Sequence, residues 1–182
     1  KDNNLYLYRL NDIDRKKAIL DLISSEEKTL LNEKSLHLGW SVVDPKTVEK
    51  YIASLNEMGV DKITFIYSDY SQKNFKVNIE KLEKILINSS CQCGRSNIIK
   101  LDVCKNIETF IKENPDTYFL DFSNVSINEK CDEIKTLVIG CEGGFSAKER
   151  EKFNKENIVG FNSSLILRSE TAIISAGSKI LL

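Results

Sequence analysis

Apolar residues follow two alternating patterns from residue 35 to the end of the chain. Short runs of consecutive apolar residues, which are typical of buried parallel strands, are separated by stretches in which apolar residues recur at helical spacing. The predicted strands are 35–43, 62–67, 97–101, 117–122, 135–140 and 157–161, and the predicted helices are 45–59, 79–94, 107–111, 146–154 and 169–182. This alternation predicts an α/β layer structure with a parallel sheet, in which ligands collect at the carboxyl ends of the strands.

The first 34 residues carry a different pattern. Apolar residues alternate with polar and aromatic ones over 5–10 and 18–22, which predicts two short strands joined by a polar turn at 11–14. Because an isolated hairpin is only marginally stable in water, we expect residues 1–34 to be the end of a small β domain that begins before the supplied chain. Residues 35–182 are then expected to form a separate domain. The missing initiator Met agrees with this expectation.

Composition and charge narrow the class of protein. The 26 Lys and Arg residues nearly balance the 27 Asp and Glu residues, which excludes a histone-like polycation. No apolar run approaches the roughly 20 residues that span a bilayer, and no signal peptide opens the chain. Cys91 and Cys93 are close in sequence, but they lack the second ligand pair that a zinc site needs, and His37 is remote. We therefore expect a cytoplasmic protein with free thiols, no metal and no membrane partner.

The segment 139–146, Ile-Gly-Cys-Glu-Gly-Gly-Phe-Ser, joins a predicted strand to a predicted helix. Its adjacent residues Gly143 and Gly144 allow positive φ and close approach of the backbone to a ligand. Ser146 and Glu149 have the spacing of a capping box. The segment lacks the glycine pattern of a dinucleotide-binding fold and the Lys of a P-loop. The residues alone therefore leave two interpretations: a ligand-binding loop, or a tight turn before a well-capped helix.

Two arginines stand near predicted helix ends. Arg168 precedes the last helix, where a cation opposes the helix dipole, so its position needs a reason other than helix stability. The alternative is a surface ion pair between Arg168 and Glu170. Arg95 follows the helix that runs toward Gly94. The dipole at the C-terminal end of a helix favours a cation, so helix stability alone explains the position of Arg95.

Three segments, in this order, resemble the RsmE family of 16S ribosomal RNA uridine methyltransferases, which belongs to the SPOUT superfamily. Gln92 with Arg95 resembles the family's E-Q-[SC]-x-R segment, residues 140–146 its G-P-E-G-G-[FL]-[ST] motif, and residues 167–172 its L-R-[TS]-E-T-A motif. The resemblance runs from about residue 35 to the C-terminus. It implies a SPOUT-type parallel sheet with a deep trefoil knot in its C-terminal part, preceded by the end of a PUA-like β-barrel in residues 1–34. It also implies a homodimer in which each active site is completed across the interface.

The same resemblance implies that S-adenosylmethionine lies bent in the knot, held by three loops at 120–123, 139–144 and 165–169. The residues implied to contact the cofactor are Leu120, Phe122, Ile139, Gly140, Cys141, Glu142, Gly143, Gly144, Leu165, Ile166, Leu167 and Ser169. Three positions depart from the family pattern. Cys141 stands where Pro is usual, Ser163 where Gly is common, and Leu165 where a basic residue is common.

The implied reaction is methylation of uracil N3 in 16S ribosomal RNA within the small ribosomal subunit. N3 becomes a good nucleophile only after it loses its proton, and Glu142 or Glu170 is expected to accept that proton or to orient a water that does. Arg95 or Arg168 is expected to stabilise negative charge on the uracil oxygens or to hold a phosphate. The target base must be unpaired or splayed out, because pairing hides N3.

The net charge of -1 gives little general attraction to RNA, so we expect local groups to bind it. Arg15, Lys16 and Lys17 form one candidate patch, and Gln92 with Arg95 forms another. Two alternatives stay open. In the first, the chain is a SPOUT methyltransferase for transfer RNA or for another ribosomal position. In the second, it is a non-catalytic RNA-binding or assembly protein that has kept the fold.

Overall fold

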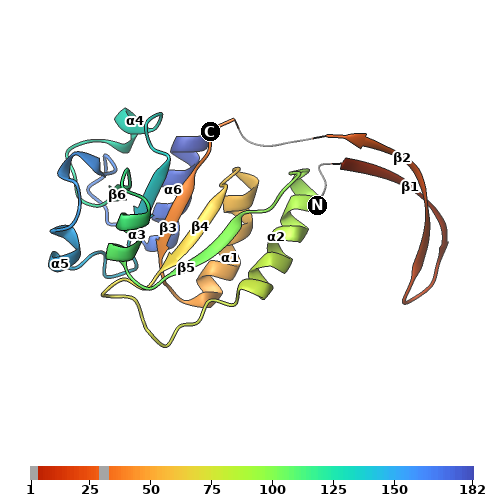
Figure 1. Cartoon of the computed structure of the whole chain (residues 1–182), viewed down its shortest axis with the longest axis horizontal. Helices are drawn as coiled ribbons and strands as arrows, with labels where there is room; N and C mark the ends of the chain where they lie inside the picture. The colour runs from red at the N-terminus through yellow and green to blue at the C-terminus, as the bar shows by residue number, and fades with distance from the viewer. Residues whose placement is uncertain (1–3, 29–32) are drawn as a thin grey trace.

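The body of the protein is a six-stranded parallel sheet covered by helices on both faces (Figure 1). The structure, a computed structural model, describes residues 4–28 and 33–182. The strands are β3 (His37–Ser41), β4 (Lys62–Ile66), β5 (Lys100–Cys104), β6 (Tyr118–Leu120), β7 (Thr136–Ile139) and β8 (Ile158–Val159), in the order β5-β4-β3-β7-β6-β8. The helices are α1 (Pro45–Glu57), α2 (Ile79–Cys93), α3 (Ile107–Glu113), α4 (Ile127–Lys130), α5 (Ala147–Arg150) and α6 (Ser169–Leu181), with a 3-10 turn at Lys155–Asn157. The predicted α/β class with a parallel sheet is confirmed.

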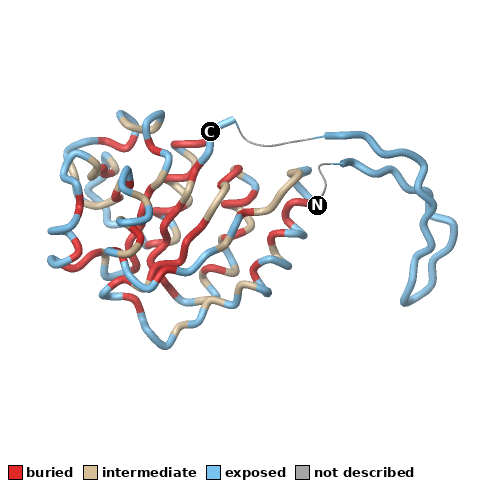
Figure 2. Tube along the Cα trace, viewed as in Figure 1, coloured by how far each residue is buried: buried red, intermediate tan, exposed pale blue. Residues whose placement is uncertain are grey.

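The apolar runs of the strands supply two cores, one on each face of the sheet. Leu137 and Ile139 of β7 belong to the larger core, which also takes the buried faces of α1, α2 and α6. Val138, between them, points to the smaller core. Successive side chains of a strand point to opposite faces, so a strand that is buried on both faces needs an unbroken apolar run. The buried residues lie in the strands of the sheet and along the helices that cover it (Figure 2).

The smaller core is aromatic. Phe119 of β6 stacks on Phe153 with ring centroids 3.7 Å apart, and Phe145 meets Phe153 edge to face at 5.0 Å. Phe145 directly follows the glycine segment 140–144, so this packing anchors the far end of that segment. All three rings are at least nine-tenths buried, and we expect their burial to hold α5 against β6.

Four sequence predictions differ from the structure. The strand predicted at 97–101 lies at 100–104. The backbone amide of Ile99 donates instead to the buried Asn56 side chain. β5 is also an edge strand with exposed residues, so it lacks a clear apolar run. The turn predicted at 11–14 lies at 14–17, where the Asp14 carboxylate accepts the amides of Lys16 and Lys17. Helix α5 ends at Arg150, well before residue 154, and α4 was not predicted. Both helices have only four residues, too few for a periodic pattern.

The N-terminal strands β1 (Asn4–Ile13) and β2 (Ala18–Glu27) form an antiparallel hairpin that extends away from the body (Figure 1). Every residue of both strands is exposed. Large apolar side chains, including Leu7, Leu10 and Ile19, are more than half exposed. The two predicted strands are therefore confirmed, although residues 1–3 and 29–32 of the predicted domain 1–34 lie outside the described residues.

Candidate functional site

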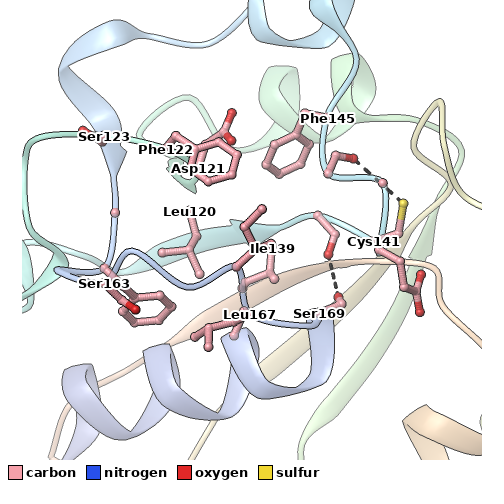
Figure 3. Close-up of a pocket in the computed structure, with 18 of the residues that line it drawn as sticks. Leu120, Asp121, Phe122, Ser123, Ile139, Cys141, Phe145, Ser163, Leu167 and Ser169 are labelled. Carbon is pink, nitrogen blue, oxygen red and sulfur yellow. Dashed lines mark hydrogen bonds between the residues drawn. The ribbon is translucent and has the colours of Figure 1, made fainter.

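A cavity lies at the carboxyl ends of β6 and β7, where the segment leading into α6 crosses them (Figure 3). Its volume is about 660 Å³, within the range of roughly 300–1,000 Å³ that is usual for small-molecule sites. Three segments line it: 120–124, 139–145 and 160–169. These are the three loops that the sequence resemblance implied, and they converge because carboxyl ends of parallel strands share one edge of the sheet.

The glycine segment 140–144 makes a tight turn that needs glycine at two positions. The Gly144 amide donates to the Cys141 carbonyl at 2.9 Å, and Gly144 has a φ of +68°. A Cβ on Gly140 would lie 3.0 Å from the Gly144 Cα. Two backbone stretches thus pack against each other where other residues place side chains, and the backbone itself forms one wall of the cavity.

Helix α5 after this turn is capped as its sequence predicts. The Ser146 hydroxyl accepts the Glu149 amide at 3.1 Å, and the Glu149 carboxylate accepts the Ser146 amide at 2.8 Å. The other Glu149 oxygen accepts the amide of Asp69 at 2.9 Å, although Asp69 lies 80 residues earlier. Glu149 is 5% exposed, so a capping residue also joins α5 to the loop that follows β4.

Ser169 fixes the start of α6 to the glycine segment. Its hydroxyl donates to the Gly140 carbonyl at 2.5 Å (Figure 3). The same hydroxyl accepts the Trp40 indole N–H at 3.0 Å. Trp40 is fully buried and Ser169 is 3% exposed. The predicted cofactor residue Ser169 therefore lines the cavity, but its hydroxyl is already engaged in holding two of the three loops together.

The predicted catalytic side chains on these loops are accessible to solvent or partly so. Glu142 is exposed and lines the cavity, whereas Arg168 and Glu170 stand just beside it at the first turn of α6. Within residues 4–28 and 33–182, Arg168 makes no ion pair or side-chain hydrogen bond, so the alternative surface pair with Glu170 is not formed there. An exposed Arg at a helix N-terminus with no such partner is available to bind an anion.

Arg95 and Gln92 lie elsewhere. Arg95 is near the amino ends of β4 and β5, with its side chain 7% exposed. Its guanidinium donates to the Asn56 carbonyl at 2.9 Å and to the Asn97 side chain at 2.6 Å, and lies 3.7 Å from Asp61. Burial lowers the pKa of Arg95, opposed by the nearby carboxylate. These contacts cap the C-terminal end of α1, where Arg95 binds a carbonyl of the last turn. Within one chain, Arg95 does not reach the cavity.

The other RNA-binding candidates are also distant from the cavity. Arg15, Lys16 and Lys17 form the exposed tip of the hairpin, at the end of the molecule away from β6 and β7 (Figure 1). Gln92 is exposed in the last turn of α2. The structure therefore brings together the predicted cofactor residues, but not the predicted RNA-binding residues.

Two charged residues that line the cavity were missed by the sequence reasoning. Arg150, at the end of α5, donates to the Asp121 carboxylate through Nε at 2.6 Å and Nη2 at 3.0 Å. This ion pair raises the pKa of Arg150, and partial burial opposes the rise. Asp121 directly follows β6, and its position at the carboxyl end of a predicted strand could have marked it as a site residue. Nothing in the sequence pairs Asp121 with Arg150.

The mouth of the cavity carries an apolar lip. Phe122 is 79% exposed, Leu165 76% and Ile166 81%, and all three line the cavity. Single exposed apolar residues are ordinary, but large ones gathered around a cavity indicate a surface that a ligand or another protein covers.

The described residues hold neither a metal-binding cluster nor a membrane-spanning helix. Within them, no group of three or more His, Cys, Asp or Glu residues could hold a metal ion. No helix in the same residues is long and apolar enough to cross a membrane. The five cysteines are free.

Comparison with known proteins identifies the family of the chain. Residues 31–181 match the RNA methyltransferase domain family. A ribosomal RNA small subunit methyltransferase E from Helicobacter pylori is 38% identical over 181 residues, covering 98% of this chain and 80% of the relative. The protein of that name from Aquifex aeolicus is 28% identical, covering 96% and 80%.

Solved structures share the fold. A ribosomal RNA small subunit methyltransferase E from Neisseria gonorrhoeae, bound to S-adenosylmethionine, has a TM-score of 0.81 at 16% identity, covering 97% of this chain and 78% of that one. A methyltransferase from Legionella pneumophila, also with this cofactor bound, has a TM-score of 0.78 at 24% identity, covering 98% and 78%. The family match and the identity to the Helicobacter protein together show that this chain is an RNA methyltransferase of the family that contains ribosomal RNA small subunit methyltransferase E.

Proposed function

We propose that this chain transfers the methyl group of S-adenosylmethionine to N3 of an unpaired uracil in 16S ribosomal RNA of the small ribosomal subunit. The observation that carries the proposal is the convergence of three backbone loops on one cavity, with the exposed Glu142 in its wall and Arg168 beside it. Family membership supplies the reaction class. Because small ribosomal subunits are cytoplasmic, the same proposal places the chain in the cytoplasm.

The residues present suit the cofactor. Leu120, Ile139 and Leu167 point into the cavity (Figure 3) and offer an apolar slot for an adenine ring. The glycine segment presents its backbone to the cavity, because Gly140 and Gly144 pack on each other so closely that a Cβ on Gly140 would meet Gly144 at 3.0 Å. Glu142, exposed in the cavity wall, supplies negative charge for a cationic ligand. When bound, S-adenosylmethionine supplies an electrophilic methyl group on its sulfonium.

The chain's own residues then prepare the uracil. We assign the proton acceptor to Glu142, because Glu142 lines the cavity and Glu170 does not. Arg168 is placed to stabilise the negative charge that develops on the uracil oxygens as the N3 proton leaves. Glu170, in the first turn of α6, is favoured there by the helix dipole and is assigned to orienting a water.

A knot and a dimer belong to the same proposal. After β8, the Gly160 amide donates to the Val125 carbonyl, and the Gly160 carbonyl accepts the Ile127 amide, each at 2.9 Å. The chain then returns to the end of β7, where Ser169 meets Gly140. This path supports threading of α6 past the segment 121–127, as a trefoil knot requires.

The apolar lip supports a homodimer whose second copy completes the active site. Gln92 and the segment around Arg95 are assigned to RNA contact through that second copy, since they do not reach the cavity of their own chain. The hairpin, with exposed apolar side chains on both strands, supports a PUA-like barrel that includes residues 1–34. Sedimentation tests the dimer: we expect the chain to be dimeric and Ile166→Asp to be monomeric, and a monomeric parent would contradict the assignment.

The activity is tested on small ribosomal subunits from cells that lack this enzyme. Incubation with S-adenosylmethionine should add one methyl group to 16S ribosomal RNA, located at uracil N3 by mass analysis of RNA fragments. Transfer RNA serves as the alternative substrate. Methylation of transfer RNA alone would refute the substrate assignment, and absence of cofactor binding would favour a non-catalytic protein.

A further inference from the structure

The loop between β4 and α2 places an aromatic side chain beside the glycine segment. Tyr70 is 56% exposed. A Cβ on Gly143 would lie 3.1 Å from the Tyr70 Cβ and 3.2 Å from its Cδ2, so the ring packs against Gly143 where any other residue would carry a side chain. Tyr70 does not line the cofactor cavity, whereas Gly143 does. The ring therefore stands on the outer side of the cavity wall.

A fixed cation stands beside the neighbouring glycine. A Cβ on Gly144 would lie 3.7 Å from Nη2 of Arg150, and two N–H groups of that guanidinium are held by Asp121. A guanidinium has five N–H donors, and the described residues supply no acceptor for the other three. The ion pair thus orients Arg150 without using up its capacity to bind an anion.

One buried network sets the positions of both side chains. The Glu149 carboxylate, next to Arg150 in sequence, accepts the amide of Asp69, next to Tyr70. The Ser146 hydroxyl donates to the Asp69 carboxylate, and the hydroxyls of Ser68 and Ser71 lie 2.9 Å apart. Ser68, Ser71 and Glu149 are all more than nine-tenths buried. The loop that carries Tyr70 is therefore anchored to α5, the helix that ends at Arg150.

We propose that Tyr70 and Arg150 form a nucleotide-binding site at the edge of the cofactor cavity, in which Tyr70 stacks on the base next to the target uracil and Arg150, which lines that edge, holds a backbone phosphate. Splaying out a target base leaves its neighbour without a stacking partner, and aromatic side chains replace that partner in RNA-binding proteins. Arg binds phosphate with parallel hydrogen bonds. The site rests on the proposed function, because Glu142, the assigned proton acceptor, directly precedes Gly143.

The test compares variants that separate RNA contact from cofactor binding. For each variant we would measure methylation rates against the concentration of small ribosomal subunits, binding of the subunits by cosedimentation, and S-adenosylmethionine affinity by calorimetry. Tyr70→Ala should raise the KM for subunits about tenfold, the usual scale for loss of one stacked base, with cofactor affinity unchanged. Tyr70→Phe keeps the ring and should match the parent.

Arg150→Lys keeps a positive charge beside Asp121 but loses the planar fork, and should raise the same KM at least about fivefold, roughly 1 kcal/mol. Lys152→Ala is its matched control, because Lys152 is an exposed cation two residues away that pairs with Glu108. It should behave as the parent.

Two outcomes overturn the nucleotide site. Parental KM and parental cosedimentation in Tyr70→Ala would show that the ring does not touch RNA. Equal losses of cofactor and subunit affinity would show that the ring only packs over the glycine segment. A parent chain that transfers no methyl group would refute the proposed function instead, and cosedimentation would still decide whether Tyr70 contacts the subunit.

Discussion

Ser169→Ala removes one oxygen atom that joins three elements. The Trp40 indole N–H, which is fully buried, loses its acceptor at 3.0 Å, and the Gly140 carbonyl loses its donor at 2.5 Å. A buried donor left without a partner costs about 1–3 kcal/mol. Allowing for the second lost bond, we expect the variant to be less stable by about 2–3 kcal/mol. For a chain of this size that lowers the Tm by roughly 4–12 °C.

Calorimetric melting and urea unfolding measure this loss, with Ser178→Ala as the control. Ser178 lies on the same helix and is half-buried, and its hydroxyl has no hydrogen bond among the described residues. The Gly140 carbonyl belongs to the wall of the cofactor cavity, so Ser169→Ala should also weaken S-adenosylmethionine binding severalfold. A stability change below about 0.5 kcal/mol, the usual range of surface substitutions, would refute the claim that this hydroxyl holds the loops together.

Three further predictions concern single positions. Gly144→Val should abolish cofactor binding in calorimetry, because Gly144 has a φ of +68°, which a β-branched residue rarely adopts; parental affinity would contradict the backbone-wall assignment. Arg168→Lys should fold normally but methylate subunits about tenfold more slowly at saturating cofactor, a loss of about 1.4 kcal/mol, and an unchanged rate would remove Arg168 from the mechanism. His37 has a pKa lowered from 6.5 to about 4, first by burial and then by Lys62. The folded state disfavours the charged imidazole, so neutral His37 contributes stability that is fully present above pH 6.5. That stability is lost as the pH falls toward 4. His37→Gln should flatten the fall of the urea midpoint across that window, and an equal fall in both proteins would show that other groups cause it.

Local patterns in the sequence were enough for part of the fold and part of the site. The strand runs, the Pro45 helix start, the glycine turn and the capping box at Ser146 each depend on residues within a few positions of one another. Along the chain, strands and helices alternate as the apolar runs and the helical spacing of apolar residues predict (Figure 1). The residue range of β5 was predicted wrongly because an edge strand carries exposed residues and lacks the unbroken apolar run of a central strand.

Contacts between distant residues could not be read in this way. Asp121 and Arg150 are 29 residues apart, and Asp69 and Glu149 are 80 apart; their pairing follows from strand order, which no local period encodes. Arg95 shows the converse. From the sequence, we expected the dipole of the helix that Arg95 follows, α2, to favour its charge. In the structure, the Arg95 guanidinium instead binds a carbonyl at the C-terminal end of α1.

The β1–β2 hairpin gives the chain two levels of cooperativity. Its two strands pair with two register shifts, and all of their residues are exposed. Its amides should therefore open to solvent with far less free energy than those of β3, β4 and β7, which lie between two cores. Hydrogen exchange should therefore label residues 4–27 within the time in which the central strands remain protected. Thermal unfolding followed by a probe in the hairpin, such as Tyr6 or Tyr8, should precede the transition reported by Trp40, and a single free energy of unfolding then describes only the body.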